Sequence, residues 1–376
     1  MHRYGAGGLR NNRGPVVFMK VLHLPTAVGG NSWALAQAEK SLGLESSVMV
    51  TRRNWPGYST DIDLGLQLAR TPVGKAVRLL RGVAAIRSRY DVLHFNFGSS
   101  LLHYPRWGLN QADLSFYPPQ VRLFATYNGC DARQKFPTMA RQAIAACHDA
   151  NCYGGMCNSG KLDEQRRQGI KKMAEHAAHL WALNPDLLHF LPPEKSSFLP
   201  YVAAQGDAWS KPRPSKGPLA VVHAPTNRAA KGTEHILRAV ERIEFERPGR
   251  IRLTLIEGLS HAEALARYRE ADLAIDQVLI GWYGGFACEL MQMGKPVISR
   301  IEEQDLHFIP AAMREDVKQT IINAGPDNLH EVLLQCIDDR DFLLDRGKAS
   351  LEYVHRWHHP DYVAGLTKER YERAAA

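Results

Sequence analysis

The sequence lacks the features of several classes of protein. No stretch approaches the 18 or more uncharged apolar residues that a membrane-spanning helix needs. Residues 1–15 contain no apolar segment of the kind that secretory signals carry, and we expect them to form a disordered leader. Internal repeats and low-complexity tracts are also missing. These absences argue against a membrane-spanning, secreted or repeat protein and favour a cytoplasmic one.

Cysteine is scarce, with six residues in a chain of 376. Without a secretory signal, this number argues against a disulfide framework, and we expect reduced thiols. Four of the six lie close together in the sequence, at Cys130, Cys147, Cys152 and Cys157. Three explanations of this four-cysteine cluster are open: a structural zinc site that fixes the neighbouring loop, free buried thiols, or a redox pair.

The charged residues contain no run of lysine and arginine with interleaved aromatics, which argues against a nucleic-acid polymer as partner. Basic residues nevertheless outnumber acidic ones by 47 to 39, which gives a net charge of +8. An excess of this sign favours nucleotides, phosphates or acidic lipid surfaces. Residues 161–175 and a stretch with Arg78, Arg81 and Arg89 are basic, which predicts contact with an anionic membrane surface; a solvated helix face is the alternative.

Length and composition predict two globular domains. The chain is more than twice the usual domain size of roughly 150 residues. Short apolar runs alternate with helix-forming stretches over residues 16–202, at 18–23, 47–50, 91–97, 121–126, 179–183 and 198–202. This alternation predicts an open α/β sheet. One helix is expected over 75–90, with Leu79, Leu80, Val83 and Ile86 on its buried face.

A proline-rich polar stretch at 203–217 predicts a linker between the two domains. The α/β pattern restarts after it, with strands at 219–223, 251–256, 273–276 and 296–299. Ser260 and Glu263 have the spacing of a capping box that opens a helix. We therefore expect a second doubly wound domain over 218–355, facing the first across a cleft that the carboxyl ends of the strands line.

A glycine-rich loop follows the predicted strand 273–276. Gly281, Gly284 and Gly285 precede a helix that carries Glu289. Glycines let backbone amides approach a ligand closely, and a helix N-terminus presents free N–H groups, so a diphosphate fits there. Glu289 could then accept hydrogen bonds from two sugar hydroxyls. The alternative is a tight turn in which Glu289 only complements the helix dipole.

Two cations lie in the loop after the predicted strand 219–223. Arg228 and Lys231 precede a helix, where together they could neutralise the charge that builds on a leaving diphosphate. The alternative is that both are solvated loop charges.

The combination of these loops resembles a known family. The residues that carry the resemblance are Gly29-Gly30, Asn128-Gly129-Cys130-Asp131, Asn227-Arg228, Lys231-Gly232-Thr233, Gly284-Gly285-Phe286, Glu289, and Met293-Gly294-Lys295-Pro296-Val297. Together they look like the retaining, nucleotide-sugar-dependent glycosyltransferases of GT-B fold, of the family 4 or group 1 type. The resemblance covers 17–371, and its C-terminal half is the more specific part.

The resemblance implies a role for each candidate residue. Glu289 matches the second glutamate of a Glu-x7-Glu motif and would hold the donor ribose, whereas the first glutamate falls at Gly281, a departure that leaves the donor sugar open. Arg228 and Lys231 would grip the diphosphate. The resemblance places Gly29, Gly30, Gly284, Gly285 and Phe286 at the donor. Asn128 stands where a histidine is common, and Asp131 would bind donor or acceptor hydroxyls.

The resemblance also implies a reaction. A sugar would pass with retention from a UDP- or GDP-sugar to a carbohydrate or lipid-linked carbohydrate acceptor, without a metal cofactor, in the synthesis of a cell-surface polysaccharide or glycoconjugate. The N-terminal domain would receive the acceptor, at the inner face of the cell membrane, and a C-terminal helix over 356–376 would cross back to it. The alternatives are a nucleotide-sugar epimerase of the same fold and a non-catalytic protein that binds a glycan or a partner.

Overall fold

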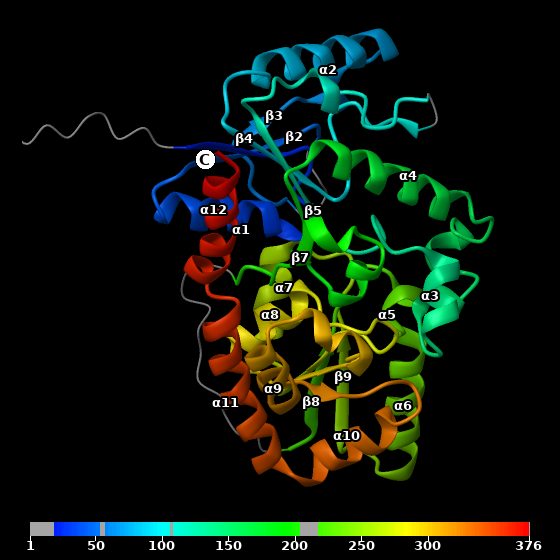
Figure 1. Cartoon of the computed structure of the whole chain (residues 1–376). Helices are drawn as coiled ribbons and strands as arrows, with labels where there is room; N and C mark the ends of the chain where they lie inside the picture. Colours follow the sequence, from blue (N-terminus) through cyan, green and yellow to red (C-terminus); the bar gives the residue numbers. More distant parts are fainter. Residues whose placement is uncertain (1–18, 53–56, 106–107, 204–216, 376) are drawn as a thin grey trace, which may run out of the picture.

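The computed structural model describes residues 19–375, apart from 53–56, 106–107 and 204–216. The predicted leader and nearly all of the predicted linker lie outside these residues. Two parallel β-sheets with helices packed around them form an N-terminal and a C-terminal domain (Figure 1). The predicted two-domain α/β architecture is thereby confirmed. None of the described helices is long and apolar enough to cross a bilayer.

The N-terminal sheet has seven parallel strands in the order β3-β2-β1-β4-β5-β6-β7. Its strands are β1 (Lys20–Leu24), β2 (Glu45–Val50), β3 (Ile62–Asp63), β4 (Val92–Asn96), β5 (Arg122–Tyr127), β6 (His179–Ala182) and β7 (Ser196–Phe198). Its helices are α1 (Asn31–Ser41), α2 (Pro72–Ile86), α3 (Lys135–Arg141) and α4 (Lys161–His176). The central strands β4 and β6 are buried along their whole length, as expected for parallel strands covered on both faces.

The C-terminal sheet has five parallel strands in the order β12-β11-β10-β8-β9. They are β8 (Leu219–His223), β9 (Ile251–Leu255), β10 (Leu273–Ile275), β11 (Val297–Ser299) and β12 (Ile322–Asn323). The helices are α5 (Arg228–Lys231), α6 (Thr233–Glu246), α7 (His261–Tyr268), α8 (Gly285–Gln292), α9 (Ala311–Thr320), α10 (Leu329–Asp338), α11 (Arg340–Trp357) and α12 (Pro360–Ala375). Since β8 lies between β9 and β10, the strand order reverses there, and ligands of such sheets bind outside the carboxyl ends of the strands at this point.

The helix expected over 75–90 is α2, which begins and ends a few residues earlier. It begins at Pro72 because the Thr71 side chain accepts a hydrogen bond from the Gly74 N–H at 3.1 Å. Leu79 is buried as predicted, but Leu80 is 56% exposed, so its predicted place on the buried face is wrong. Each residue turns an α-helix by 100°, and only one side of α2 rests on the domain.

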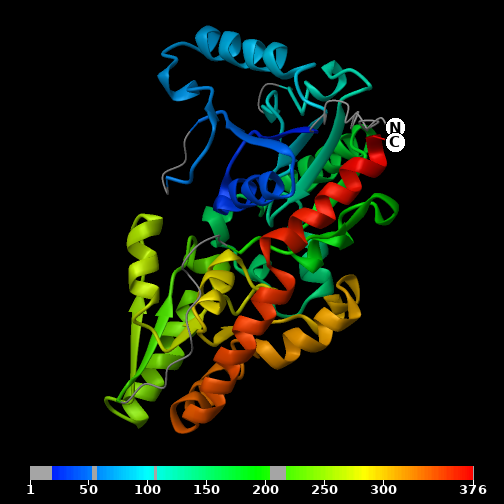
Figure 2. The same cartoon turned by 90° about the vertical axis from the view of Figure 1, so that its left-hand side faces the viewer.

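Helix α12 returns to the N-terminal domain and packs beside α1, as both views show (Figures 1 and 2). The carboxylate of Glu39 on α1 holds it there. Oε1 of Glu39 accepts hydrogen bonds from the hydroxyls of Thr367 and Tyr371, both at 3.0 Å. Its Oε2 accepts one from Ser46 at 2.7 Å and lies 2.8 Å from Nε2 of His23. A buried carboxylate therefore joins the C-terminal helix to the first sheet.

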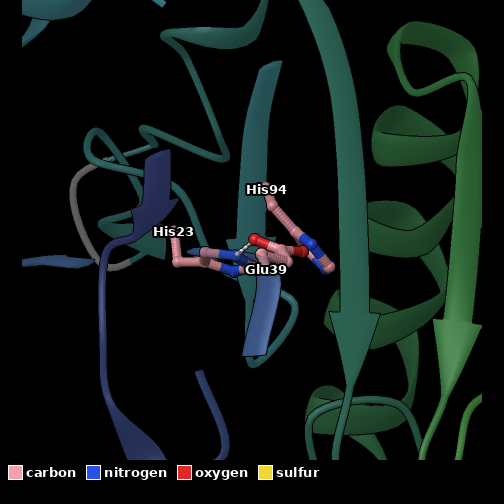
Figure 3. A group of neighbouring side chains, drawn as sticks. All are labelled: His23, Glu39 and His94. Atoms are coloured by element: carbon pink, nitrogen blue, oxygen red, sulfur yellow. Dashed lines mark hydrogen bonds and ion pairs between the residues drawn. The ribbon is translucent and has the colours of Figure 1, made fainter. Parts of the chain in front are cut away.

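His23, Glu39 and His94 form a buried group whose ligand atoms lie within 4.8 Å of one another, the only such group of His, Cys, Asp or Glu in the described part of the chain (Figure 3). The Tyr371 hydroxyl donates its proton to Glu39, so the Tyr371 oxygen accepts a hydrogen bond from Nδ1 of His94 at 2.6 Å. Nε2 of His94 then accepts a hydrogen bond from the Thr126 hydroxyl at 2.6 Å. Burial lowers the pKa of His94 well below its ordinary value. With both of its nitrogens engaged, His94 serves a hydrogen-bond network rather than a metal site.

Candidate functional site

The strand-order reversal of the C-terminal domain brings Lys231 to the glycine loop. Asp276 directly follows β10 and is 1% exposed. Its Oδ1 accepts a hydrogen bond from Nζ of Lys231 at 2.7 Å, and its Oδ2 accepts one from the Gly284 N–H at 2.6 Å. A Cβ added to Gly284 would lie 3.5 Å from Nζ of Lys231. The ammonium group therefore lies directly beside the glycine loop, with a buried carboxylate holding both.

Glycine is required at position 232 for this arrangement. Gly232 has a left-handed backbone with φ of 76°. A Cβ there would lie 2.5 Å from Cγ2 of Val278 in the loop after β10, which is too close for any side chain. The Val278 N–H donates to the Lys231 carbonyl at 3.1 Å. The loops after β8 and β10 thus pack together only because residue 232 has no side chain.

The N-terminal end of α8 can receive an anion. Its first N–H groups have no partner within the helix and carry a partial positive charge. A Cβ added to Gly285, the first residue of α8, would meet no atom within 4 Å, so the space beside it is open. Phe286 follows, and its ring packs edge-on against Tyr268 with the centroids 5.0 Å apart. Lys231 and this helix end together have the charge and donors that a phosphate needs.

Arg228 points to a different environment from Lys231. Its Nε and Nη2 donate to the two carboxylate oxygens of Glu257 at 2.9 and 2.7 Å. Nη1 lies 3.6 Å from Glu234, and the side chain is 47% exposed. In this structure Lys231 lies at the glycine loop, whereas two exposed carboxylates hold Arg228.

Glu289 lies in the second turn of α8 and pairs with a histidine. Its Oε1 is 2.6 Å from Nε2 of His261, the first residue of α7. The predicted capping box of Ser260 and Glu263 opens this helix and is confirmed. The hydrogen bond to Glu289 raises the pKa of His261. Glu289, the carboxylate expected to hold a ribose, is therefore already paired with His261, and this pairing favours the protonated form of His261.

The predicted Gly29-Gly30 loop lies close to this pair through Tyr58. Gly29 and Gly30 have left-handed backbones, with φ of 64° and 70°, and lead from β1 into α1. A Cβ on Gly30 would lie 2.9 Å from Cδ1 of Tyr58, so glycine is needed for that contact too. The Tyr58 ring lies 5.5 Å from that of His261. Tyr58 thus links the first loop of the N-terminal domain to the Glu289 pair.

Asp131 closes the turn after β5. Its carboxylate accepts hydrogen bonds from the N–H groups of Asn128, at 3.0 and 3.1 Å, and of Gly129, at 2.6 Å. Asn184 donates to the Asn128 carbonyl at 2.8 Å, while the side-chain oxygen of Asn128 is buried without a partner. Burial raises the pKa of Asp131. The amide oxygen of Asn128 is therefore an unsatisfied buried acceptor next to the turn that Asp131 closes.

His223 positions the site, although sequence reasoning assigned it no role. It ends β8 and is fully buried, and its Nδ1–H donates to the Ile275 carbonyl at 2.7 Å. Nε2 accepts from the hydroxyl of Thr233, the first residue of α6, at 2.9 Å. Burial lowers the pKa of His223 to about 4, so the neutral ring that this pattern needs is the stable form. The ring joins β8, β10 and α6 at the strand-order reversal.

Gly281 has a steric reason to lack a side chain. A Cβ there would lie 2.5 Å from the Cβ of Glu302, which follows β11. The Glu302 N–H donates to the Gly281 carbonyl at 2.9 Å, and its carboxylate pairs with Arg300. The Cβ of a glutamate therefore lies beside position 281 although the residue at 281 is glycine, a fact that sequence spacing cannot reveal.

Asp305, a buried residue of the C-terminal domain, holds the two domains together. Its Oδ1 accepts hydrogen bonds from Arg141 at 2.6 Å and His189 at 2.8 Å, and its Oδ2 accepts one from Gln142 at 3.2 Å. The Ala146 N–H also donates to the Leu279 carbonyl at 3.0 Å. The Asp305 contacts fix the N-terminal domain against the segment that follows β11, and the Ala146 contact fixes it against the loop that follows β10.

The four-cysteine cluster lies in the segment next to Asp131. Nη1 of Arg133 is 3.9 Å from the Cys130 sulfur, and Nη1 of Arg166 is 3.4 Å from the Cys157 sulfur. Burial, followed by the other three thiols, raises the pKa of Cys152 to about 12. All four are free, and no three of their sulfurs lie within 4.8 Å of one another. Structural zinc therefore stays a prediction.

No protein-family model matches the chain, and no curated protein does. Among solved structures, sucrose-phosphate synthase from Thermosynechococcus elongatus superposes with a TM-score of 0.62 at 17% identity, over 95% of this chain and 99% of that one. The chain has the GT-B fold. WaaG, a glycosyltransferase involved in lipopolysaccharide biosynthesis, also matches, with a TM-score of 0.51 at 13% identity over 93% and 99% of the two chains.

The GT-B likeness also extends to an epimerase. UDP-GlcNAc 2-epimerase from Neisseria meningitidis, solved with UDP-GlcNAc bound, has a TM-score of 0.50 at 10% identity, over 94% of this chain and 100% of that one. Identities this low show a shared GT-B fold and not a shared activity. The function of this chain has to be inferred from its own residues.

Proposed function

We propose that this GT-B protein is a glycosyltransferase that moves a sugar from a nucleoside-diphosphate sugar to an acceptor hydroxyl, with retention at the anomeric carbon. One observation carries the proposal. Nζ of Lys231 lies beside Gly284 at the open N-terminal end of α8, and Glu289 follows one turn further along the same helix. A diphosphate and its attached ribose need this order of cation, backbone donors and carboxylate.

Lys231 can hold the diphosphate without leaving Asp276. An ammonium group has three N–H donors, and Asp276 accepts one of them at 2.7 Å. The other donors can bind phosphate oxygens while the buried carboxylate keeps the group in place. As the bond to the sugar breaks, negative charge grows on the leaving diphosphate, and a preorganised donor of this kind stabilises that charge by about 3 kcal/mol. We propose that Lys231, joined by Arg228 once it leaves Glu257, carries this role without a metal ion.

Glu289 would bind the ribose in exchange for His261. Two ribose hydroxyls donating to the carboxylate compete with Nε2 of His261, which now lies 2.6 Å from it. The Tyr58 ring of the N-terminal domain lies 5.5 Å from the His261 ring, so donor binding would be sensed by both domains. We assign Gly29, Gly30, Gly285 and Phe286 to the wall of the same donor site.

The transferred sugar would lie between Glu302 and the turn that Asn128 and Asp131 form. The buried, unpartnered amide oxygen of Asn128 can accept a sugar hydroxyl, whereas Asp131 shapes the turn. The Cβ of Glu302 lies beside Gly281, and we propose that its carboxylate, once released by Arg300, takes the place that the family assigns to a glutamate there. The N-terminal domain would receive the carbohydrate or lipid-linked acceptor, on the cytoplasmic side of the cell envelope.

Structural neighbours support a nucleotide-sugar ligand. The Neisseria meningitidis epimerase was solved with UDP-GlcNAc bound, which is a nucleotide sugar. WaaG acts in lipopolysaccharide biosynthesis, which favours a cell-surface product. The epimerase also supports a second candidate, a nucleotide-sugar epimerase, and a non-catalytic glycan-binding protein is the third.

One experiment separates these candidates. The protein is incubated with a panel of UDP- and GDP-sugars, with and without simple glycoside acceptors, and the nucleotide and sugar products are analysed by chromatography and NMR. We expect release of UDP or GDP and a product with the donor's anomeric configuration. An epimerised donor would favour the second candidate, and binding without turnover would favour the third.

A further inference from the structure

Helix α2 carries two apolar rows, and only one of them faces the domain. It lies along the outer end of the N-terminal domain in both views (Figures 1 and 2). Leu79, Val83 and Ile86 are buried against the domain. Val73, Val77 and Leu80 form the second row on another side, where they are 72%, 40% and 56% exposed. Their spacing of four and three residues aligns them along one stripe of the helix.

A further exposed apolar side chain lies in the turn that precedes α2. Leu68, at the end of the 3₁₀ helix Leu66–Leu68, is 70% exposed. A Cβ added to Gly65 would lie 3.1 Å from Cδ1 of Leu68 and 3.3 Å from Nη1 of Arg78 on α2, so these two side chains lie together. Single exposed apolar residues are common on protein surfaces, but an aligned row of them marks an interaction surface.

The charge around this row has one sign. Residues 64–90 contain no aspartate or glutamate. The exposed cations of this stretch are Arg70, Lys75, Arg78, Arg81, Arg87 and Arg89. Neither α2 nor its flanking turns therefore supply an acidic partner for these side chains. Protein surfaces that bind other proteins usually mix both signs and place aromatic anchors at the centre, and this surface does neither.

We propose that α2 is an interfacial helix that docks the protein on an anionic lipid surface. Val73, Val77 and Leu80 would enter the boundary between headgroups and acyl chains. Arg81, four residues after Val77, and Arg87, seven residues after Leu80, lie beside this row and would be at the level of the anionic headgroups, where each cation adds to the binding. The inference rests on the proposed function only for its setting, because α2 belongs to the domain proposed to receive a lipid-linked acceptor.

Co-sedimentation of the full chain with vesicles tests this surface. We expect binding to phosphatidylcholine vesicles that contain phosphatidylglycerol, little binding to pure phosphatidylcholine, and loss of binding at high salt because ions screen surface charges. Replacing both Arg81 and Arg87 by glutamine should weaken binding about 30-fold, the equivalent of about 2 kcal/mol for two cations. The triple variant Val73→Ser, Val77→Ser and Leu80→Ser should also lose binding.

Matched controls keep the result interpretable. Phe245 on α6 is 87% exposed in the C-terminal domain, so Phe245→Ser removes an exposed apolar side chain elsewhere and should leave vesicle binding unchanged. All variants should keep wild-type melting temperatures and wild-type affinity for UDP or GDP, which separates this proposal from the proposed function. The proposal would be overturned by equal binding to neutral vesicles or by an equal loss of vesicle binding in Phe245→Ser. A dimer that is seen in sedimentation and that the α2 substitutions dissociate would also overturn it.

Discussion

Replacing Lys231 by methionine tests the diphosphate site most sharply. Methionine keeps the length and apolar stem of the side chain but removes the ammonium group beside Gly284. Loss of one preorganised donor to a developing charge costs about 3 kcal/mol, which lowers turnover about 10²- to 10³-fold. The assay measures release of UDP or GDP from the donor that the wild type uses, and calorimetry measures the affinity for the same nucleotide.

The same substitution also affects stability. Asp276 is 1% exposed and would lose the cation that now lies 2.7 Å away. Breaking a buried ion pair by removing one partner costs about 3 to 5 kcal/mol. At roughly 2 to 4 °C for each kcal/mol in a domain of this size, the melting temperature should fall by about 6 °C or more. A loss of activity in Lys231→Met alone would therefore be ambiguous.

A second variant resolves this ambiguity. In Lys231→Met with Asp276→Asn, no charge is left buried, and the amide oxygen of asparagine can still accept the Gly284 N–H that now donates to Asp276 at 2.6 Å. We expect the melting temperature to recover towards the wild type while turnover stays low. The reasoning is refuted if the double variant regains turnover together with its stability. It is also refuted if turnover falls less than about tenfold in either variant, because that corresponds to under half of the expected loss of transition-state stabilisation.

Three further predictions concern other parts of the molecule. Pairing with Glu289 raises the pKa of His261 from its ordinary value of 6.5, so the protonated ring adds stability that is complete below pH 6.5 and is lost as the pH rises through the raised pKa. In melting curves from pH 5.5 to 9, His261→Asn should remove this pH dependence of stability, whose size is under about 1 kcal/mol. Tyr371→Phe takes one donor from buried Glu39 and should lower the free energy of unfolding by about 1 to 3 kcal/mol, while Tyr362→Phe on the same helix serves as control and should change it little. If the four-cysteine cluster holds zinc, metal analysis of purified protein should find about one ion per chain; below a tenth of that, the prediction is abandoned, and a thiol titration then separates free thiols from a redox pair.

The sequence was informative about elements whose residues interact with near neighbours. The alternation of apolar runs predicts both sheets, and strand 219–223 is found as β8 with the same bounds. Ser260 and Glu263 form a capping box because that motif lies within one helical turn. The α2 prediction went wrong at Leu80, since hydrophobicity alone does not tell which side of a helix meets the domain. In this protein the solvent-facing side of α2 is apolar too.

Side chains that act over a long sequence distance could not be predicted. Glu302 lies beside Gly281, and Asp305 joins the two domains through Arg141, only after the chain has folded. His223 could have been noticed as a lone polar residue at the end of a buried strand, but its partners come from β10 and α6. Tyr58 could not have been noticed in the sequence, because its contacts depend on how the two domains meet.

A crystal structure with UDP or GDP tests the central claim most directly. The account predicts the diphosphate at the N-terminal end of α8, within hydrogen-bonding distance of Nζ of Lys231 and the N–H groups of Gly285 and Phe286. It predicts ribose hydroxyls on Glu289, with His261 displaced from its present 2.6 Å contact. The account would be contradicted by a nucleotide bound elsewhere. It would also be contradicted by a crystal saturated with nucleotide in which this site is empty and the contact between His261 and Glu289 is intact.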